Sequence, residues 1–265
     1  MEFIRSRRDG KVLEIVIDRP KANAIDAALS VELGRTFAEF RDDDSLLVAI
    51  MTGAGEKFFS AGWDLRSGAE SGELPDQSPG GPFGVGGFAG ITELPDLFKP
   101  VIAAVNGLAI GGGCEIALAC DLVFAADHAM FAVPEVKVGV MADAGGVQRL
   151  ARRLPRNIAL EMLYTGRRLS ALEAMQYGLV NGVVPAARLM DHARDVARTI
   201  CEGAPLAIQA VKQIVTRGQQ ENEADLFAQM RQGRFPLYRR ALDSEDAKEG
   251  PRAFAQKRPP IFRGR

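Results

Sequence analysis

Three carboxylates lie in stretches whose other residues are mostly apolar or small, a setting in which a carboxyl group can transfer protons. Glu115 is the single charged residue of Val101–Cys120, Glu135 ends an apolar segment, and Asp143 precedes a pair of glycines. Apolar surroundings raise the pKa of a carboxyl group and suit it to acid–base catalysis near neutrality. The spacing of the three residues leaves open whether they converge in space.

Glycines precede the first of these carboxylates and can bring backbone N–H groups close to a ligand. Gly111, Gly112 and Gly113 open an Ala/Leu/Ile-rich helix. The N-terminus of a helix carries unpaired N–H groups and the positive end of the helix dipole. Glu115 lies about one turn further on, so an N–H donor and a carboxylate can face the same volume. The alternative is a plain strand–helix turn in which Glu115 caps its own helix.

Other common catalytic centres find no support in the sequence. The two histidines stand apart and there is no Gly-x-Ser-x-Gly turn, which disfavours a Ser-His triad. The Gly53-x-Gly55 pair lacks the other residues of a dinucleotide- or phosphate-binding loop, and we interpret it as a turn. The histidines and cysteines, which lack metal-ligand spacing, are His128, His192, Cys114, Cys120 and Cys201. We therefore expect no metal site.

Composition favours a globular protein of the cytoplasm. The 265 residues suit one large domain, with or without a helical appendage, and 47% of them are hydrophobic. The net charge of −1 gives no general basic field that would favour nucleic acid or an anionic membrane. An odd number of cysteines fits a reducing compartment. We see no signal peptide and no apolar run long enough for a membrane span, so we expect no membrane partner.

The candidate residues are embedded in a recurrent pattern of strands and helices. Apolar runs predict buried strands at Val12–Ile17, Leu46–Met51, Val101–Val105, Asp121–Ala126, Met130–Val133 and Val180–Val184. Helices are predicted from Asp26 to about Phe40, from Asn157 to Tyr164, and from Ser170 to Tyr177. A further helix is predicted to end at Phe98, and another to begin at Gly145. Asp26 is expected to cap the first helix, and Ser170 to form a capping box with Glu173. Strands that alternate with helices predict an α/β core.

Two stretches fall outside this pattern. Ser67–Gly87 is rich in Gly, Pro and Ser, and we interpret it as a surface loop with the composition of a lid over a site. After about Ala186 the pattern is helical with no strand signal. This tail is expected to form a separate layer or an oligomerisation element.

An ordered set of motifs resembles the enoyl-CoA hydratase/isomerase (crotonase) family over essentially the whole chain. The motifs lie at Ser60–Leu65, Lys99–Gly107, Gly111–Glu115, Pro134-Glu135, Gly145-Gly146 and Ser244–Arg258. Each is weak alone, whereas their order is highly specific. Within the family, the stretches Arg19–Ala27, Gly53–Leu65 and Ile261–Arg265 are similar to those of the carnitinyl-CoA dehydratases.

The resemblance implies a fold and a substrate class. The expected fold is an α/β spiral of ββα turns over residues 1–200, followed by a helical region over residues 201–265 that serves trimer or hexamer assembly. The expected substrate is an acyl-CoA thioester that reacts through an enolate. Coenzyme A is part of this substrate, and no metal, flavin or nicotinamide cofactor is required.

The resemblance also implies roles for individual residues. The backbone N–H groups of Trp63 and Gly112 would bind the thioester oxygen as negative charge develops on it. Glu115 would activate water for attack at Cβ and Glu135 would deliver the α-proton, with the roles reversed in dehydration. The presence of both glutamates favours a hydratase or dehydratase over an isomerase. The residues implied to bind coenzyme A or the acyl group are Lys21, Ala22, Ala24, Ala61, Gly62, Asp64, Leu65, Asp143, Phe254 and Lys257, of which the last two often reach coenzyme A, sometimes in a neighbouring subunit.

Asp143 departs from the best-known hydratases of the family, which carry glycine there, and matches the carnitinyl-CoA dehydratases and several isomerases. We hypothesise that its carboxylate offsets a trimethylammonium group on the substrate, with Trp63 adding a cation–π contact. The alternative is that Asp143 is the N-cap of the helix that begins near Gly145.

Three functions therefore compete. The first is reversible hydration of an enoyl-CoA thioester, with crotonobetainyl-CoA/carnitinyl-CoA or a short-chain enoyl-CoA as substrate. The second is enoyl-CoA delta-isomerisation, which needs one acid–base group, so a Glu115→Ala variant would keep substantial activity. The third is a non-catalytic role, since some relatives bind RNA, but the arginine clusters of this chain resemble helix surfaces rather than an RNA-binding patch.

Overall fold

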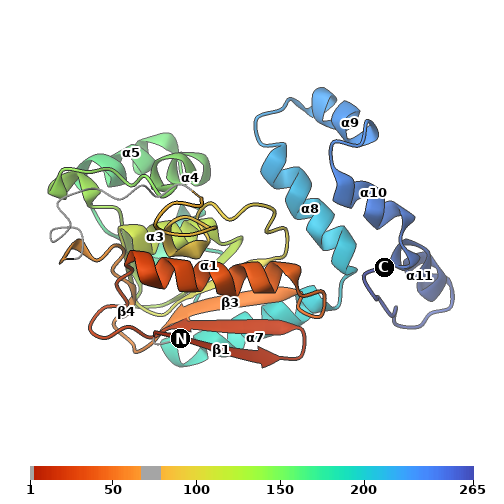
Figure 1. The fold of residues 1–265 in the computed structure, drawn as a ribbon, viewed down its shortest axis with the longest axis horizontal. Helices are drawn as coiled ribbons and strands as arrows, with labels where there is room; N and C mark the ends of the chain where they lie inside the picture. The colour runs from red at the N-terminus through yellow and green to blue at the C-terminus, as the bar shows by residue number, and fades with distance from the viewer. Residues whose placement is uncertain (1–2, 67–78) are drawn as a thin grey trace.

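A six-stranded sheet forms the centre of the computed structural model of this chain, which describes residues 3–66 and 79–265 (Figure 1). Its strand order is β1-β2-β3-β5-β7-β10. The β1–β2 hairpin is antiparallel, and every other neighbouring pair is parallel. The bounds are β1 Ile4–Asp9, β2 Val12–Ile17, β3 Val48–Gly53, β5 Val101–Val105, β7 Leu122–Ala126 and β10 Gly182–Val184.

A second, smaller sheet has the order β4-β6-β8-β9. Its strands are β4 Phe58–Ser60, β6 Leu108–Ile110, β8 Met130–Ala132 and β9 Leu169–Ser170. Successive strands alternate between the two sheets: β3, β5 and β7 are neighbours in the large sheet, and β4, β6 and β8 in the small one. Each turn of the chain therefore adds one strand to each sheet, which gives the spiral of ββα turns that the family resemblance implies.

Helices cover these sheets and continue beyond them. Those that follow the strands of the spiral are α1 Ala27–Asp42, α3 Gly112–Ala119, α4 Gly146–Arg153, α5 Arg156–Thr165, α6 Ala171–Gln176 and α7 Leu189–Cys201. The short 3₁₀ helices are η1 Phe88–Gly90, η2 Glu135–Val138 and η3 Ala186–Arg188. The last four helices are α8 Pro205–Arg217, α9 Glu223–Arg231, α10 Pro236–Asp243 and α11 Glu245–Ala255.

The helix caps predicted from the sequence are confirmed. Asp26 precedes α1, and its Oδ1 accepts a hydrogen bond of 2.8 Å from the Leu29 N–H. Ser170 and Glu173 form a reciprocal capping box at the start of α6. These contacts satisfy N–H groups that have no partner inside a helix, and each stabilises its helix by about 1 kcal/mol.

The core lies between the large sheet and the helices on its faces. All residues of β3 and β5 are buried. This confirms the prediction that apolar runs without alternating polar residues form interior strands. Helix α1 buries Leu33, Phe37 and Phe40 completely. Helix α7 packs against β3, β5 and β7.

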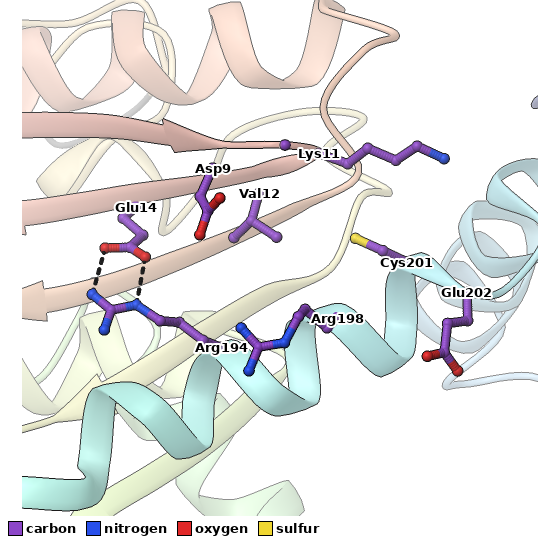
Figure 2. A pocket seen from close by; sticks show the side chains of 9 residues that line it. Asp9, Lys11, Val12, Glu14, Arg194, Arg198, Cys201 and Glu202 are labelled. Atoms are coloured by element: carbon purple, nitrogen blue, oxygen red, sulfur yellow. Dashed lines mark hydrogen bonds and ion pairs between the residues drawn. The ribbon is translucent and has the colours of Figure 1, made fainter.

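An ion pair joins the hairpin edge of the large sheet to α7 (Figure 2). The buried Glu14 carboxylate of β2 accepts hydrogen bonds of 2.7 and 3.0 Å from Arg194. Arg194 lowers the pKa of Glu14, mainly through these hydrogen bonds. A cleft of about 330 Å³ beside the pair is lined by further residues that include Lys11, Arg198 and Cys201.

Helices α8 to α11 form an arm that projects away from the sheets (Figure 1). Lys212 of α8 ties the arm to the core through a 2.6 Å ion pair with Asp121 and a 2.9 Å hydrogen bond to the Lys99 carbonyl. Arg217 reaches Asp96 at 2.5 Å. Beyond these contacts the arm packs largely on itself, with α8 and α11 both against α10.

One predicted helix is wrong. Residues 91–98 form turns instead of a helix, and η1 is the only helical segment between residue 79 and Pro100. Pro95 has no N–H to donate, and Gly87, Gly90 and Asp96 have positive φ angles of 66°, 67° and 59°. Such backbone cannot continue a right-handed helix.

Within the described residues, no helix combines the length and apolarity needed to cross a bilayer.

Candidate active site

Two loops lie side by side and form one wall of the candidate site. The Ala61 N–H donates to the Ala22 carbonyl at 3.0 Å, and the Ile25 N–H donates to the Gly62 carbonyl at 2.8 Å. The Asp64 N–H donates back to the Ile25 carbonyl at 2.8 Å. The two stretches implied to bind coenzyme A are therefore joined through their backbones, and the Trp63 N–H is left out of this ladder.

Arg19 and Asn23, whose side chains the sequence did not single out, hold the first loop in place. The Arg19 guanidinium lies 2.8 Å from Asp26 and 2.9 Å from Asp64, and it donates to the Ala24 carbonyl at 2.8 Å. Asn23 is buried with φ of 51°, and its Nδ2 donates to two backbone carbonyls. Both residues lie within the Arg19–Ala27 stretch of the family resemblance, which was the available signal.

A second wall is the N-terminus of α3, which touches the Gly62 backbone. A Cβ atom added to Gly62 would lie 2.5 Å from the Gly112 nitrogen, so only glycine allows this approach. Gly62 also has φ of 80°, and Gly111, the N-cap of α3, has φ of 58°. Neither the Trp63 N–H nor the Gly112 N–H donates to any group among the described residues. Two unpaired donors thus flank a very close backbone contact.

Glu115 projects from the first turn of α3 and is buried, with 3% of its surface exposed. Its Oε1 accepts a hydrogen bond of 2.8 Å from the Gly146 N–H at the start of α4. Burial raises the pKa of Glu115 to about 8, and this hydrogen bond acts in the opposite direction. Glu115 therefore caps α4, not its own helix, and the alternative of a self-capping glutamate is wrong.

Glu135 begins η2 and faces the same glycines. Its Oε1 would lie 3.0 Å from a Cβ added to Gly111. Both carboxyl oxygens are buried and have no hydrogen-bond partner among the described residues. Burial raises the pKa of Glu135, and the charge of Asp143 raises it further. A buried carboxyl group without a partner is costly in a folded protein and points to a function.

The three carboxylates do converge. The charges of Glu135 and Asp143 both raise the pKa of Glu115. Asp143 itself is exposed and lies in the turn before α4. Gly145, in a left-handed conformation, is the N-cap of α4, so the interpretation of Asp143 as that cap is wrong.

The remaining residues implied by the family differ in their positions. Lys21, with φ of 76°, and Leu65 are exposed next to the paired loops, while Trp63 is half-buried. The Asp64 carboxylate is paired with Arg19. Phe254 of α11 is 86% exposed, and α11 lies at the far end of the arm from α3 and α4 (Figure 1). Phe254 and Lys257 are therefore not brought to the site of their own chain.

Comparison with known proteins places these features in a family. A family model described as "Enoyl-CoA hydratase/isomerase" matches residues 7–265. A carnitinyl-CoA dehydratase of Proteus mirabilis is 56% identical over 97% of this chain and 96% of its own length. One from Escherichia coli K12 is 54% identical over 100% of this chain and 99% of its own.

Solved structures agree with this result. An enoyl-CoA hydratase from Mycobacterium tuberculosis superposes with a TM-score of 0.89 at 38% identity, covering 99% of both chains. A carnitinyl-CoA hydratase from Mycobacterium avium superposes with a TM-score of 0.74 at 40% identity, covering 100% of both chains. With its alternating sheets, paired backbone donors and converging glutamates, the chain belongs to the enoyl-CoA hydratase/isomerase family.

Proposed function

We propose that this protein reversibly hydrates an enoyl-CoA thioester, with Glu115 and Glu135 as its two acid–base groups. The observation that supports this most is that two buried carboxyl groups with raised pKa lie at the N-terminus of α3, beside two unpaired backbone donors. Glu115 is in the first turn of α3, and Glu135 lies against Gly111. An isomerase needs one proton carrier, whereas addition of water needs one group for the water and one for the α-carbon.

The proposed reaction runs through an enolate. Glu115 removes a proton from water as the water oxygen attacks Cβ, and the electrons of the double bond move to the thioester oxygen. The N–H groups of Trp63 and Gly112 bind that oxygen, and each such donor contributes about 3 kcal/mol in the transition state. The Glu135 carboxyl group then gives its proton to the α-carbon. Proton exchange between the two glutamates restores the starting state, and dehydration is the reverse path.

The raised pKa values suit this exchange. Burial opposes the charged form of both carboxyl groups, so it raises the pKa of Glu115 to about 8 and raises the pKa of Glu135 above its ordinary value. Mutual repulsion favours a state in which the two glutamates share one proton, which is the state that the cycle needs. The chemistry requires no metal and no redox cofactor.

The acyl group is proposed to be the crotonobetainyl/carnitinyl pair. The support is the identity above 50% to proteins named carnitinyl-CoA dehydratase. It also includes the exposed Asp143 carboxylate, whose charge acts on both glutamates and would attract a trimethylammonium group. We further propose that the protein is a cytoplasmic enzyme that assembles as a trimer or hexamer through the helical arm, with Phe254 and Lys257 serving a neighbouring copy.

The test is loss of enoyl-thioester ultraviolet absorbance with crotonobetainyl-CoA and, in parallel, with crotonyl-CoA. We expect faster turnover of the betaine, a loss of at least about 10²-fold in Glu115→Gln and in Glu135→Gln, and a weaker preference for the betaine in Asp143→Asn. Equal preference in Asp143→Asn and the parent protein would refute the role of Asp143. A Glu115→Ala variant that still shifted double bonds would favour the isomerase.

A further inference from the structure

Arg149 is a half-buried residue of α4, the helix whose first N–H binds Glu115. Its Nη1 donates to the Ala144 carbonyl at 3.0 Å, and its Nη2 donates to the carbonyl of the buried Thr92. A Cβ added to Gly145 would lie 1.7 Å from Nη1, so the guanidinium covers this glycine directly. One side chain thus clamps the turn that leads into α4.

The clamped turn presents the N–H that Glu115 accepts. Gly146 follows the turn at once, and a Cβ there would lie 2.9 Å from Glu115 Oε1. A shift of the turn by a fraction of an ångström would therefore change the 2.8 Å hydrogen bond between the Gly146 N–H and Glu115. Arg149 is the charged side chain of α4 that connects the Thr92 carbonyl to this turn, and so to the Glu115 carboxyl group.

We propose that Arg149 is a positioning residue that holds the Gly146 N–H on Glu115 and supplies the positive charge that balances the carboxylates of the site. The charged groups that act on Glu115 are Glu135 from η2, Asp143 from the turn before α4, and Arg149 from α4. Of these only Arg149 is positive, and it favours the ionised form of Glu115. Burial lowers the pKa of Arg149, and the charge of Arg153 acts in the same direction. Glu115, Glu93 and Cys120 act in the opposite direction.

Helix α4 offers a matched control. Arg153 lies one turn further on, is also half-buried, and donates through Nη2 to the Cys120 carbonyl. Its charge is not among the main influences on the pKa of Glu115, whereas the charge of Arg149 is. Replacing Arg153 removes the same kind of side chain from the same helix. It leaves in place the contacts that hold the turn before α4 and the charge of Arg149.

The experiment compares pH profiles of hydration for Arg149→Met, Arg149→Lys and Arg153→Met. Without the guanidinium charge, the acidic limb of kcat should move up by about one pH unit in Arg149→Met, with about a tenfold loss at pH 7. Arg149→Lys should keep the limb but lose kcat, because an ammonium cannot span two carbonyls. Arg153→Met should keep the limb. An unmoved limb in Arg149→Met, or an equal shift in Arg153→Met, would overturn the proposal.

A second measurement separates this inference from the proposed function. Only the kinetic experiment above rests on the proposed function. The infrared carboxyl band that disappears in Glu115→Gln can be titrated without turnover, and it should show the same upward shift in Arg149→Met. An inactive parent protein would refute the proposed function and leave this titration decisive. If Arg149→Met fails to fold, Arg149→Gln, which keeps a hydrogen-bond donor without the charge, should show the same shift.

Discussion

Glu115 serves two purposes with one carboxyl group. Its Oε1 is the acceptor that satisfies the first N–H of α4, and its burial raises its pKa to about 8. A cap is usually an ionised or neutral acceptor at a surface, where it costs little. Here the acceptor lies in the interior, so the proton that Glu115 carries in the proposed mechanism also lowers the free-energy cost of burying the carboxyl group.

The raised pKa makes the stability of the protein depend on pH. The folded state holds the Glu115 proton more tightly than the unfolded chain does, because its pKa rises from 4.5 to about 8. This stabilisation is complete below pH 4.5 and is lost as pH rises through 8. Between pH 6 and pH 9 we expect the free energy of unfolding to fall by about 2–3 kcal/mol from this group, and urea unfolding of Glu115→Gln should show a flatter dependence.

The control for this prediction is a carboxyl group with the opposite shift. Hydrogen bonds from Arg258 lower the pKa of the half-buried Glu249 to about 2, so Glu249 is ionised in both states between pH 6 and pH 9. Glu249→Gln should keep the full pH dependence of the parent protein. An equally steep loss of stability in Glu115→Gln would show that another group causes it.

The sequence predicts the character of these residues better than their partners. The apolar surroundings of Glu115 correctly indicate its raised pKa. Its capping partner, Gly146, is 31 residues away, and no local pattern connects the two. Asp143 stands where a cap is common, but the left-handed Gly145 takes that position. Which acceptor satisfies a helix N-terminus is decided by tertiary packing.

At the level of elements, the site is an approach between a loop and a helix N-terminus. Gly62 and Gly112 touch because neither has a side chain. The donors of Trp63 and Gly112 therefore owe their relative position to backbone packing. A change that forces the two segments apart should affect the reaction more than the fold.

Gly62→Ala tests this expectation. The new Cβ would lie 2.5 Å from the Gly112 nitrogen and would displace one donor segment, so we expect kcat to fall by about 10²–10³. Gly55→Ala is the matched control, because Gly55 has the same φ of 80° but nothing within 4 Å. It should lose about 1 kcal/mol of stability from backbone strain and keep its activity. Equal activity in the two variants, measured with enoyl-CoA, would contradict the argument.

Long elements were predicted well. Of the short ones, β8 and β10 were predicted from their apolar runs, and others were missed. The buried strands around Val101–Val105 and the capped helix after Asp26 have clear signals of length, composition and capping. The strands β4 and β6 contain three residues each, too few for a periodic pattern. Strand β1 exposes five of its six residues, and its exposed charges conceal it. The segment before Pro100 differs from the predicted helix because its apolar residues, such as Ile91 and Leu94, are buried in turns.

At the scale of the whole molecule, the core and the arm are held by different means. The core has two sheets and a continuous apolar interior, whereas the arm is tied to it through polar contacts such as Lys212–Asp121. The loss of strand signals predicts a helical region after about Ala186, and the family resemblance implies a boundary at residue 200, close to the end of α7 at Cys201. That boundary stays a prediction. Assembly into a trimer or hexamer stays a prediction that rests on the family resemblance.

The hairpin edge of the core depends on one ion pair (Figure 2). Glu14 is 6% exposed, so replacing Arg194 by leucine leaves a nearly buried carboxylate without its main partner. We expect a loss of about 2–3 kcal/mol in denaturant unfolding for Arg194→Leu, and a smaller loss when Glu14→Leu is added. Arg198→Leu, whose partner Asp195 is well exposed, should cost less than about 1 kcal/mol. Additive losses in the double variant would contradict the role of the pair.

The use of main-chain donors has a consequence for inherited variation. A codon change can replace the side chain of Trp63 or Gly112, but no codon except one for proline removes a peptide N–H. Damaging alleles should therefore accumulate at the neighbouring glycines, such as Gly62 and Gly113, where any larger residue collides with backbone. The two glutamates, in contrast, can be exchanged one at a time while the donors persist. A lineage with this fold can therefore change its reaction while the backbone N–H groups proposed to bind the thioester oxygen stay in place.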